Sequence, residues 1–217
     1  MTDNNQHSSL KDEENLISQQ QRKAERHKQR QQRVKQTVDA KVAAAQEEKG
    51  ILLVLTGNGK GKSTSGFGTI ARSVGHGKKS AVVQFIKGKW QCGERTLLEG
   101  AGVEFHVMST GFTWETQDKE KDTQAAEIAW AAAEALLKDE SIDCLMLDEL
   151  TYMVSYHYLE VDRVIEALKN RPPMQHVIIT GRACHRAIIE LADTVSEVQS
   201  IKHAFEGGVK AQPGFDY

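Results

Sequence analysis

The run GNGKGKST at residues 57–64 combines glycines, lysines and hydroxyl side chains in the manner of a phosphate-binding loop. Its three glycines allow the backbone to turn tightly, so that successive N–H groups point into a hollow the size of an anion. Lys62 is of the type that contacts nucleotide phosphates, and Ser63 is of the type that reaches a Mg²⁺ ion. The usual spacing, G-x-x-x-x-G-K-[ST], would place a glycine where this chain has Thr56. We therefore predict a nucleotide-phosphate site in a loop whose glycine spacing is shortened by one residue.

A second candidate for phosphate chemistry is the run CLMLDE at residues 144–149. Four apolar positions followed by Asp148 and Glu149 place two carboxylates at the carboxyl end of a buried strand, where they can hold a hydrated Mg²⁺. Glu149 is also suited to act as a general base, which keeps an ATPase open as an alternative. These two motifs alone predict a protein that binds a magnesium nucleotide.

The elements that must position these residues follow from apolar runs and helical segments that alternate over residues 50–217. The apolar runs predict strands over 51–56, 80–87, 103–109, 142–150, 176–181 and 195–201. The segments between them predict helices over 62–74, 94–98, 118–138, 161–170 and 185–193. This alternation is typical of an α/β fold, here a P-loop NTPase-like (RecA-like), mostly parallel sheet with helices on both faces. Ligands bind at the carboxyl ends of such strands, where Arg182 follows the run VIIT.

The first 49 residues differ from the rest of the chain, since they contain no aromatic residue. Residues 1–17 are polar, and we expect them to be disordered. Residues 18–49 predict a basic helix with a thin stripe of valines (Val34, Val38 and Val42), which must dock on the main domain or on a partner chain. Basic residues without interleaved aromatic side chains favour a solvated helix face over a nucleic-acid site.

Composition limits the kinds of partner and the compartment. The formal net charge of −2 at pH 7 gives no general preference for nucleic acid or for an anionic membrane. Cys92, Cys144 and Cys184 are widely spaced without a CxxC pair, so we expect reduced thiols and neither a disulfide framework nor a zinc site. No apolar run approaches the length of a membrane span, and the polar N-terminus has no signal-peptide core. We expect a cytoplasmic protein without nucleic-acid or membrane partners.

Several longer segments taken together are more specific than the two motifs. They are TGNGKGKST, VGHGKKSAVVQFIKGKW, GERTLLE, GVEFHVMSTGFTWETQ, LDELTYMVSYHYL, VIITGRACHR, LADTVSEV and KHAFEGGVKAQPGFDY. In these segments and their spacing, residues 30–217 resemble the ATP:corrinoid adenosyltransferases of the CobA/BtuR type. The resemblance implies that a Co(I) corrinoid, either cob(I)alamin or cob(I)yrinic acid a,c-diamide, attacks C5′ of ATP and releases triphosphate. A metal-centred nucleophile of this kind requires no general base.

The resemblance also implies roles for the residues of the two motifs. ATP binding is implied for Gly57, Asn58, Gly59, Lys60, Gly61, Lys62, Ser63, Thr64 and Arg182. Ser63, Asp148 and Glu149 are expected at a Mg²⁺ (or Mn²⁺) ion. Lys62 is expected to be catalytic, because it would hold the triphosphate as it departs.

Two further parts of the chain are linked to the corrinoid by the resemblance. Phe112 and Trp114, in the run GFTW, are expected to pack beneath the corrin ring and exclude its lower axial ligand. Exclusion of that ligand would make reduction to Co(I) feasible for a flavodoxin-type reductant. On composition alone, aromatic residues in a loop more often belong to a core or a lid than to a chemical site. The resemblance further implies a homodimer, and a helix over residues 30–48 that closes over the corrinoid site of its own or a partner subunit.

Other classes of function stay open at this point. A RecA-like ATPase that binds nucleic acid through residues 22–35 would release ADP and phosphate, whereas an adenosyltransferase releases intact triphosphate. A non-enzymatic carrier of nucleotide or corrinoid would bind without turnover. Complete cobalamin and the a,c-diamide precursor both stay open as the physiological substrate.

Overall fold

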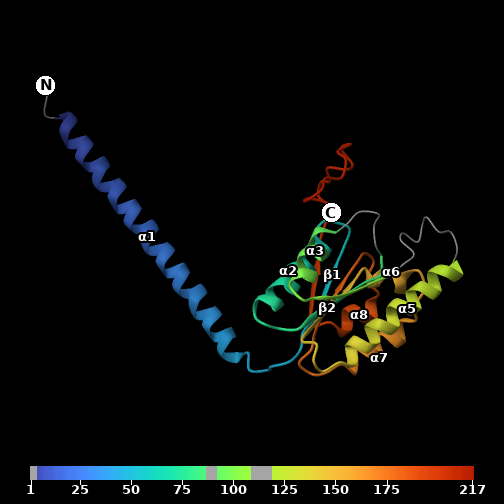
Figure 1. The fold of residues 1–217 in the computed structure, drawn as a ribbon. Coiled ribbons are helices and arrows are strands. Elements are labelled where there is room, and N and C mark those ends of the chain that lie inside the picture. Colours follow the sequence, from blue (N-terminus) through green and yellow to red (C-terminus); the bar gives the residue numbers. More distant parts are fainter. Residues whose placement is uncertain (1–3, 87–91, 109–118) are drawn as a thin grey trace. The chain divides into compact units, whose positions relative to one another are not determined.

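The computed structural model describes residues 4–86, 92–108 and 119–217. Internal contacts divide the chain into two units, Met1–Glu48 and Lys49–Tyr217, which are described separately. The elements, labelled in Figure 1, are α1 (Asn4–Ala44), β1 (Leu52–Thr56), α2 (Lys62–Gly75), β2 (Ser80–Gln84), α3 (Gly93–Gly100), β3 (Glu104–Val107), α5 (Lys119–Lys138), β4 (Cys144–Asp148), α6 (Leu150–Ser155), α7 (Val161–Lys169), β5 (His176–Thr180), α8 (Arg186–Leu191) and β6 (Thr194–Glu197).

The first unit consists of the long helix α1. Residues 4–17, for which the sequence predicts disorder, belong to this helix, which then ends at Ala44, before the predicted end at residue 49. Neither glycine nor proline occurs between its two ends, so nothing in the sequence interrupts the helix. The valine stripe is open to solvent, with Val34 56%, Val38 51% and Val42 68% exposed. These valines therefore add nothing to the core of the protein.

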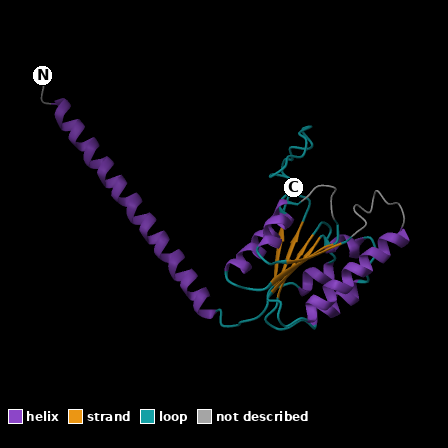
Figure 2. Cartoon of the chain, viewed as in Figure 1, coloured by secondary structure: helices purple, strands orange, loops and turns teal. Residues whose placement is uncertain are grey.

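The second unit is built on a six-stranded sheet in the order β3-β2-β4-β5-β1-β6. Figure 2 draws its strands in orange, with helices on either side of them. Every described strand pairing is parallel, which confirms the predicted α/β class. The central strand β4 is buried at all five positions, as expected of a strand covered on both faces. The edge strand β6 is exposed throughout and ends at Glu197, four residues before the predicted end.

Helices cover both faces of the sheet, as the alternating pattern predicts. On one face, α2 and α3 contribute Phe67, Ile70 and Leu98 to a core cluster. On the other face, α5, α6, α7 and α8 contribute to a larger cluster whose largest buried side chain is Trp130. Figure 1 shows the two sets of helices on opposite sides of the strands. This layered arrangement leaves the ends of the strands as the place where polar side chains can gather.

The turn after β4 differs from the prediction. The sequence predicts a strand as far as residue 150, whereas β4 ends at Asp148 and α6 begins at Leu150. Glu149 joins them with φ 60°, in the left-handed region that few non-glycine residues adopt. The chain therefore bends sharply between Asp148 and Leu150, and the two neighbouring acids face different surroundings.

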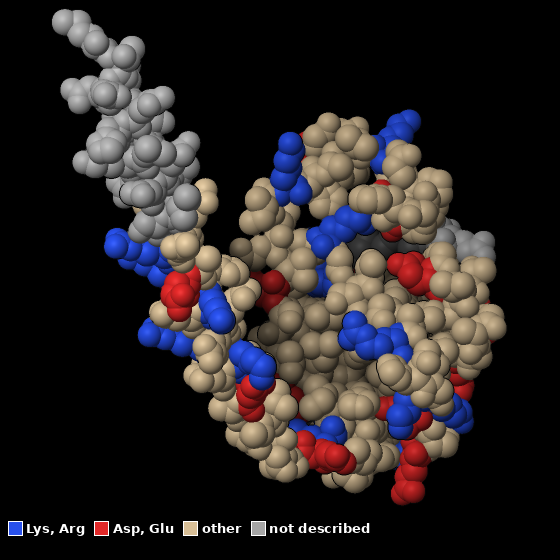
Figure 3. Space-filling view, turned by 90° about the vertical axis from the view of Figure 1, so that its left-hand side faces the viewer, with Lys and Arg blue, Asp and Glu red and all other residues tan. Residues whose placement is uncertain are grey.

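The surface carries both signs of charge. On the face of the second unit drawn in Figure 3, Lys and Arg side chains lie among Asp and Glu side chains. Among the helices of the described residues, none has the length and apolar character required to cross a membrane.

Candidate nucleotide-binding site

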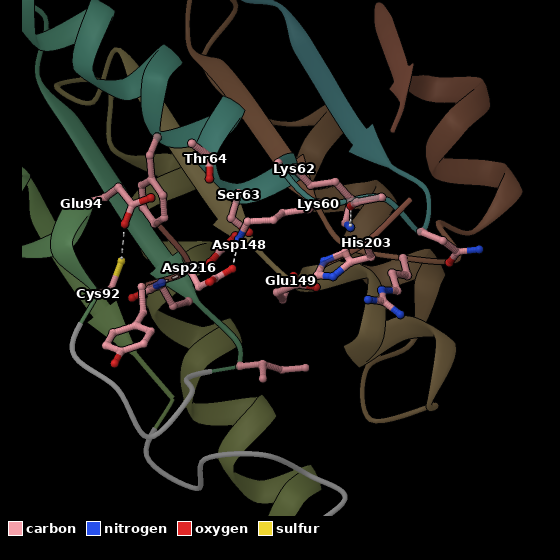
Figure 4. Close-up of a pocket in the computed structure, with 18 residues that line it drawn as sticks. Lys60, Lys62, Ser63, Thr64, Cys92, Glu94, Asp148, Glu149, His203 and Asp216 are labelled. Carbon is pink, nitrogen blue, oxygen red and sulfur yellow. Dashed lines mark hydrogen bonds and ion pairs between the residues drawn. The ribbon is translucent and has the colours of Figure 1, made fainter. Parts of the chain in front are cut away.

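A pocket of about 350 Å³ lies at the carboxyl ends of the strands (Figure 4). It brings together ten of the residues that the sequence singles out, namely Asn58, Gly59, Lys60, Gly61, Lys62, Ser63, Thr64, Asp148, Glu149 and Arg182. The parallel pairing of β4 with β5 and of β5 with β1 explains this meeting, because parallel strands end at the same edge of the sheet. Phe112 and Trp114 lie outside the described residues.

The loop after β1 is pressed against the chain that follows β6. A Cβ atom at Gly57 would lie 2.5 Å from the Val198 carbonyl oxygen, and one at Gly59 would lie 2.5 Å from that of Gln199. The Gly59 N–H donates a hydrogen bond to the Val198 carbonyl at 2.7 Å. Gly57 does not line the pocket, and its φ of 99° serves this close approach. At these two positions glycine therefore fits the loop to the fold, in addition to the role in anion binding that the sequence predicts.

The positive side of the pocket is formed by Lys62 and the start of α2. The preceding residue, Gly61, has φ 116° and caps the helix, and as a glycine it offers no side-chain acceptor to the first amides of α2. Lys62 is only 7% exposed, and its Nζ donates to the Gly59 carbonyl at 2.8 Å. Burial lowers the pKa of Lys62, Glu149 opposes this shift, and Arg182 adds to it. An ammonium group, the first amides of a helix and a guanidinium together form a site suited to a polyanion.

Asp148 is a buried hydrogen-bond acceptor at the base of the pocket. The Thr180 hydroxyl donates to its Oδ1 at 2.7 Å, and the Gln84 side-chain amide donates to its Oδ2 at 3.1 Å. Burial raises the pKa of Asp148, while hydrogen bonds from Thr180, Gln84 and Ser63 oppose the shift. Asp148 therefore ties β2, β5 and the start of α2 together beneath the loop.

Glu149 is the acid without such partners. Its backbone N–H donates to the Thr180 hydroxyl oxygen at 3.0 Å, so one hydroxyl connects both acids. Within the part of the chain that the structure describes, its buried Oε2 atom accepts no hydrogen bond. Burial, followed by the charge of Asp148, raises the pKa of Glu149 to about 7, against the influence of Lys62 and Arg182. Burial of a carboxylate oxygen without a hydrogen bond costs free energy unless a cation or a hydrogen-bond donor contacts that oxygen.

The oxygen donors at the pocket fit a hard divalent cation. Ser63, Asp148 and Glu149 supply a hydroxyl and carboxylates, the ligand types that Mg²⁺ prefers, and the orphaned Glu149 Oε2 offers it a partner. Among the described residues no cluster of three or more His, Cys, Asp or Glu could hold a metal unaided. This suits Mg²⁺, which is held by one or two carboxylates together with water and substrate phosphates.

Sequence reasoning missed several residues at the pocket. Thr180 ends the run VIIT in the way that Asp148 ends CLMLD, so a polar residue at a strand end was an available signal. Its neighbour Gly181 has φ 133°, and a Cβ atom there would lie 2.0 Å from Thr151 Oγ1. That hydroxyl donates to the Arg182 carbonyl at 2.6 Å, which fixes the backbone of the predicted arginine.

Other pocket-lining side chains come from segments to which the sequence assigns no role. Cys92 and Glu94 lie at the start of α3, and His203, Asp216 and Tyr217 lie in the segment after β6. The last three belong to KHAFEGGVKAQPGFDY, a segment that contributes to the family resemblance. Lys60, expected at the nucleotide, is paired with Asp216 at 2.7 Å.

Comparison with known proteins gives matches over nearly all of the chain. Residues 48–217 match the family model of the ATP:corrinoid adenosyltransferases BtuR/CobO/CobP, and residues 13–42 match a model of the cob(I)alamin adenosyltransferase N terminal region. The corrinoid adenosyltransferase of Escherichia coli (strain K12) is 63% identical over 193 residues, which cover 89% of this chain and 98% of that relative. The corrinoid adenosyltransferase CobA of Salmonella typhimurium gives the same identity and coverage. The corrinoid adenosyltransferase of Pseudomonas aeruginosa is 49% identical over 197 residues, or 90% of this chain and 97% of that relative.

These relatives offer no support for the alternative of a nucleic-acid-binding ATPase. The family model spans the phosphate loop, both acids, Arg182 and the segment after β6, which are the parts that form the pocket. The chain is therefore a member of the ATP:corrinoid adenosyltransferase family.

Proposed function

We propose that this enzyme transfers the 5′-deoxyadenosyl group of ATP to the Co(I) centre of a corrinoid substrate and releases triphosphate. The cobalt electron pair forms the Co–C5′ bond, the C5′–O bond breaks, and its electrons leave with the triphosphate oxygen. The observation that carries this proposal is a polyanion site, made of Lys62, Arg182 and the start of α2, in a chain of this family. The leaving group needs such a site, because negative charge develops on it as the bond breaks.

The residues of the loop have separate tasks in this proposal. Lys62 and the first amides of α2 bind the triphosphate and stabilise it as it departs, and Arg182 adds a second positive charge at the strand edge. Asn58 and Thr64 line the same pocket and would add contacts to the nucleotide, whereas Lys60, which also lines it, is paired with Asp216. Because the nucleophile is the reduced corrinoid, Glu149 is not required as a base.

The acids serve a divalent ion in this proposal. Ser63 and Glu149 would hold Mg²⁺ or Mn²⁺, and Asp148 would act through its hydrogen bonds with Thr180 and Ser63. The ion would neutralise charge on the triphosphate. The protein contributes the buried carboxylate of Glu149, whose Oε2 atom needs a partner.

The corrinoid side of the reaction rests on parts that the sequence singles out. We propose that Phe112 and Trp114 exclude the lower axial ligand, so that a flavodoxin-type reductant can produce Co(I). Phe112→His or Trp114→Ala should then slow transfer that starts from Co(II) and flavoprotein more than transfer that starts from chemically reduced Co(I). Equal losses in the two assays would limit both residues to shaping the pocket.

Assembly and location complete the proposal. The exposed valines of α1 need a surface to cover, which supports a homodimer in which this helix closes over a corrinoid site. The free thiols Cys92, Cys144 and Cys184 agree with the prediction of a cytoplasmic protein, which stays a prediction.

One assay tests the reaction itself. Protein, Mg²⁺, ATP and chemically reduced cob(I)alamin are mixed in the dark, and the light-sensitive Co–C product is followed by absorbance while the phosphates are separated by chromatography. We expect one triphosphate for each adenosylated corrinoid. Release of ADP and phosphate without a Co–C bond would instead identify an ATPase.

A further inference from the structure

The segment after β6 forms one wall of the nucleotide pocket. His203, Asp216 and Tyr217 line this pocket, whereas the exposed Phe205 lines a neighbouring hollow. Figure 4 shows His203 and Asp216 among the side chains that surround the loop lysines and the two acids. The function proposed above gives these three residues no task.

An ion pair attaches this segment to the phosphate loop itself. Lys60 Nζ lies 2.7 Å from Asp216 Oδ1, and the same ammonium lies 5.6 Å from the centre of the Phe215 ring. Asp216 Oδ2 accepts a hydrogen bond from the Gln212 N–H at 2.8 Å, and the Gly214 N–H donates to the Tyr217 carbonyl at 2.8 Å. The turn that presents Tyr217 is thus held by its own backbone and by a loop residue two positions from Lys62.

The chemistry of the pocket is divided between its two sides. Lys62, Arg182 and the α2 amides are suited to phosphates, whereas the charge of Asp216 is matched by that of Lys60. Among the described side chains that line the pocket, those of His203 and Tyr217 combine a planar ring with a hydrogen-bonding group. A purine base and a ribose are recognised by groups of this kind, through stacking and a few placed hydrogen bonds.

The imidazole of His203 already has a defined orientation. Its Nδ1 accepts a hydrogen bond from the Phe205 backbone N–H at 3.2 Å. In the neutral ring the proton then resides on Nε2, which makes this atom a donor for an acceptor on a ligand.

We propose that His203 and Tyr217 form the subsite for the nucleoside part of ATP, and that the Lys60–Asp216 ion pair positions them. This inference rests on the proposed function, because it takes the triphosphate to lie at Lys62. With the phosphates held by the loop, contacts on the nucleoside fix the position of C5′, the atom that is attacked.

The test compares two ligands that share the triphosphate and differ in the nucleoside. Binding of ATP and of inorganic triphosphate, each with Mg²⁺ and without corrinoid, is measured by titration calorimetry for Tyr217→Ala and His203→Ala. We expect affinity for ATP to fall about tenfold in each variant, the size of a lost ring contact with a base. Affinity for inorganic triphosphate should change by less than about twofold, since its contacts are untouched. Phe205→Ala, an exposed aromatic residue of the same segment outside this pocket, is the matched control and should bind both ligands normally.

The ion pair is tested with Asp216→Asn, which keeps the shape and removes the charge. It should weaken ATP about threefold, the scale of one partly exposed ion pair, and leave inorganic triphosphate within about twofold. Equal losses for both ligands, or no loss for ATP, would overturn the subsite. Thermal unfolding of each variant separates these outcomes from general damage. Because no corrinoid is present, the subsite can fail while adenosyl transfer by the unmodified enzyme stands, and the reverse.

Discussion

The valines of α1 and those of the inner strands of the sheet differ sharply in their exposure. Val38 of α1 is 51% exposed, whereas Val54 of β1 and Val83 of β2 are fully buried. The side chains are identical, so the difference lies in what faces them: β1 and β2 contribute to the core clusters on both faces of the sheet, and a single helix has no second layer of its own. The comparison teaches that the described part of the second unit contains its own core and the candidate nucleotide pocket, while the valine stripe of the first unit adds to no core.

The largest effect should follow from a change at the nucleotide site. Lys62→Ala removes the buried ammonium beside the departing triphosphate, so we expect adenosyl transfer from ATP to chemically reduced Co(I) corrinoid to fall about 10²-fold or more. Lys78→Ala, in an exposed ion pair of the second unit with Asp143 and not among the residues that line the pocket, is the control and should keep its activity. Near-normal transfer by the Lys62 variant would show that the loop has no part in the mechanism, and it would contradict the assignment of the nucleotide site to this pocket of the second unit.

The stability of the two regions can be compared with one matched pair of substitutions. Val54→Ala should lower the free energy of unfolding by about 2 kcal/mol, because it opens a cavity in the sheet core. Val38→Ala should change it by less than about 0.5 kcal/mol, since half of that side chain already meets solvent. Urea unfolding followed by tryptophan fluorescence measures both. Equal losses would mean that the stripe is part of the same cooperative core.

Removal of the first unit should affect the binding of the two substrates differently. Removal of residues 1–48 should leave affinity for magnesium ATP within about twofold, because the pocket lies wholly in the second unit. Corrinoid affinity should fall at least about tenfold if α1 covers that substrate, as a lost apolar contact of moderate size would produce. Fluorescence titration with each ligand measures these affinities. An unchanged corrinoid affinity would show that α1 does not cover the corrinoid and that the valine stripe has another role.

The smallest effect concerns the pH dependence of metal binding. Burial raises the pKa of Glu149 to about 7, so this carboxyl takes up a proton as the pH falls through neutrality and ceases to attract a cation. Affinity for Mn²⁺, measured by electron paramagnetic resonance, should fall about threefold between pH 7.5 and 6.5. The stability of the metal-free protein should depend on pH with the opposite sign. The pKa of Glu149 is near 4.5 in the unfolded chain and about 7 in the folded protein. Its contribution to the free energy of unfolding is therefore fully present below about pH 4.5 and is lost as the pH rises through about 7.

Glu149→Gln provides the control for this pH dependence. The amide cannot titrate, so Mn²⁺ affinity should be weaker at every pH and its slope over this interval should disappear. A slope that persists in the variant would assign the titration to another group.

Most of the candidate site was predictable because its residues adjoin their elements. The loop follows an apolar strand, Asp148 ends another, and Arg182 follows a third. The hydrophobic pattern and the residues that end each strand are therefore enough to place them at one edge of a parallel sheet. Thr180 was not predicted, because its role depends on the contact of β4 with β5, which brings one hydroxyl within reach of both acids. The sequence predicts strand β5, but it does not show that β5 pairs with β4.

The positions of Glu149 and Lys60 were also beyond the sequence. A strand pattern continues through Glu149, and only the packing of α6 on β5 shows that the chain turns there with a positive φ. Lys60 was assigned to the nucleotide, and its pairing with Asp216 depends on a segment more than a hundred residues later in the chain. Such a contact leaves no periodic signal in either segment.

By itself, the sequence determined the α/β class, the phosphate loop, the acidic strand end and, through its resemblance to known enzymes, the adenosyltransferase family. These features are encoded locally, in hydrophobic period and in short runs whose backbone geometry is set by glycine. Only the tertiary structure decided that Asp148 is a buried acceptor while Glu149 keeps an unpartnered oxygen, and that His203 and Tyr217 join the pocket. The reason is physical: burial and charge around a side chain are set by neighbours that are distant in sequence, and the order of the strands and the packing of helices and loops on them decide which neighbours those are.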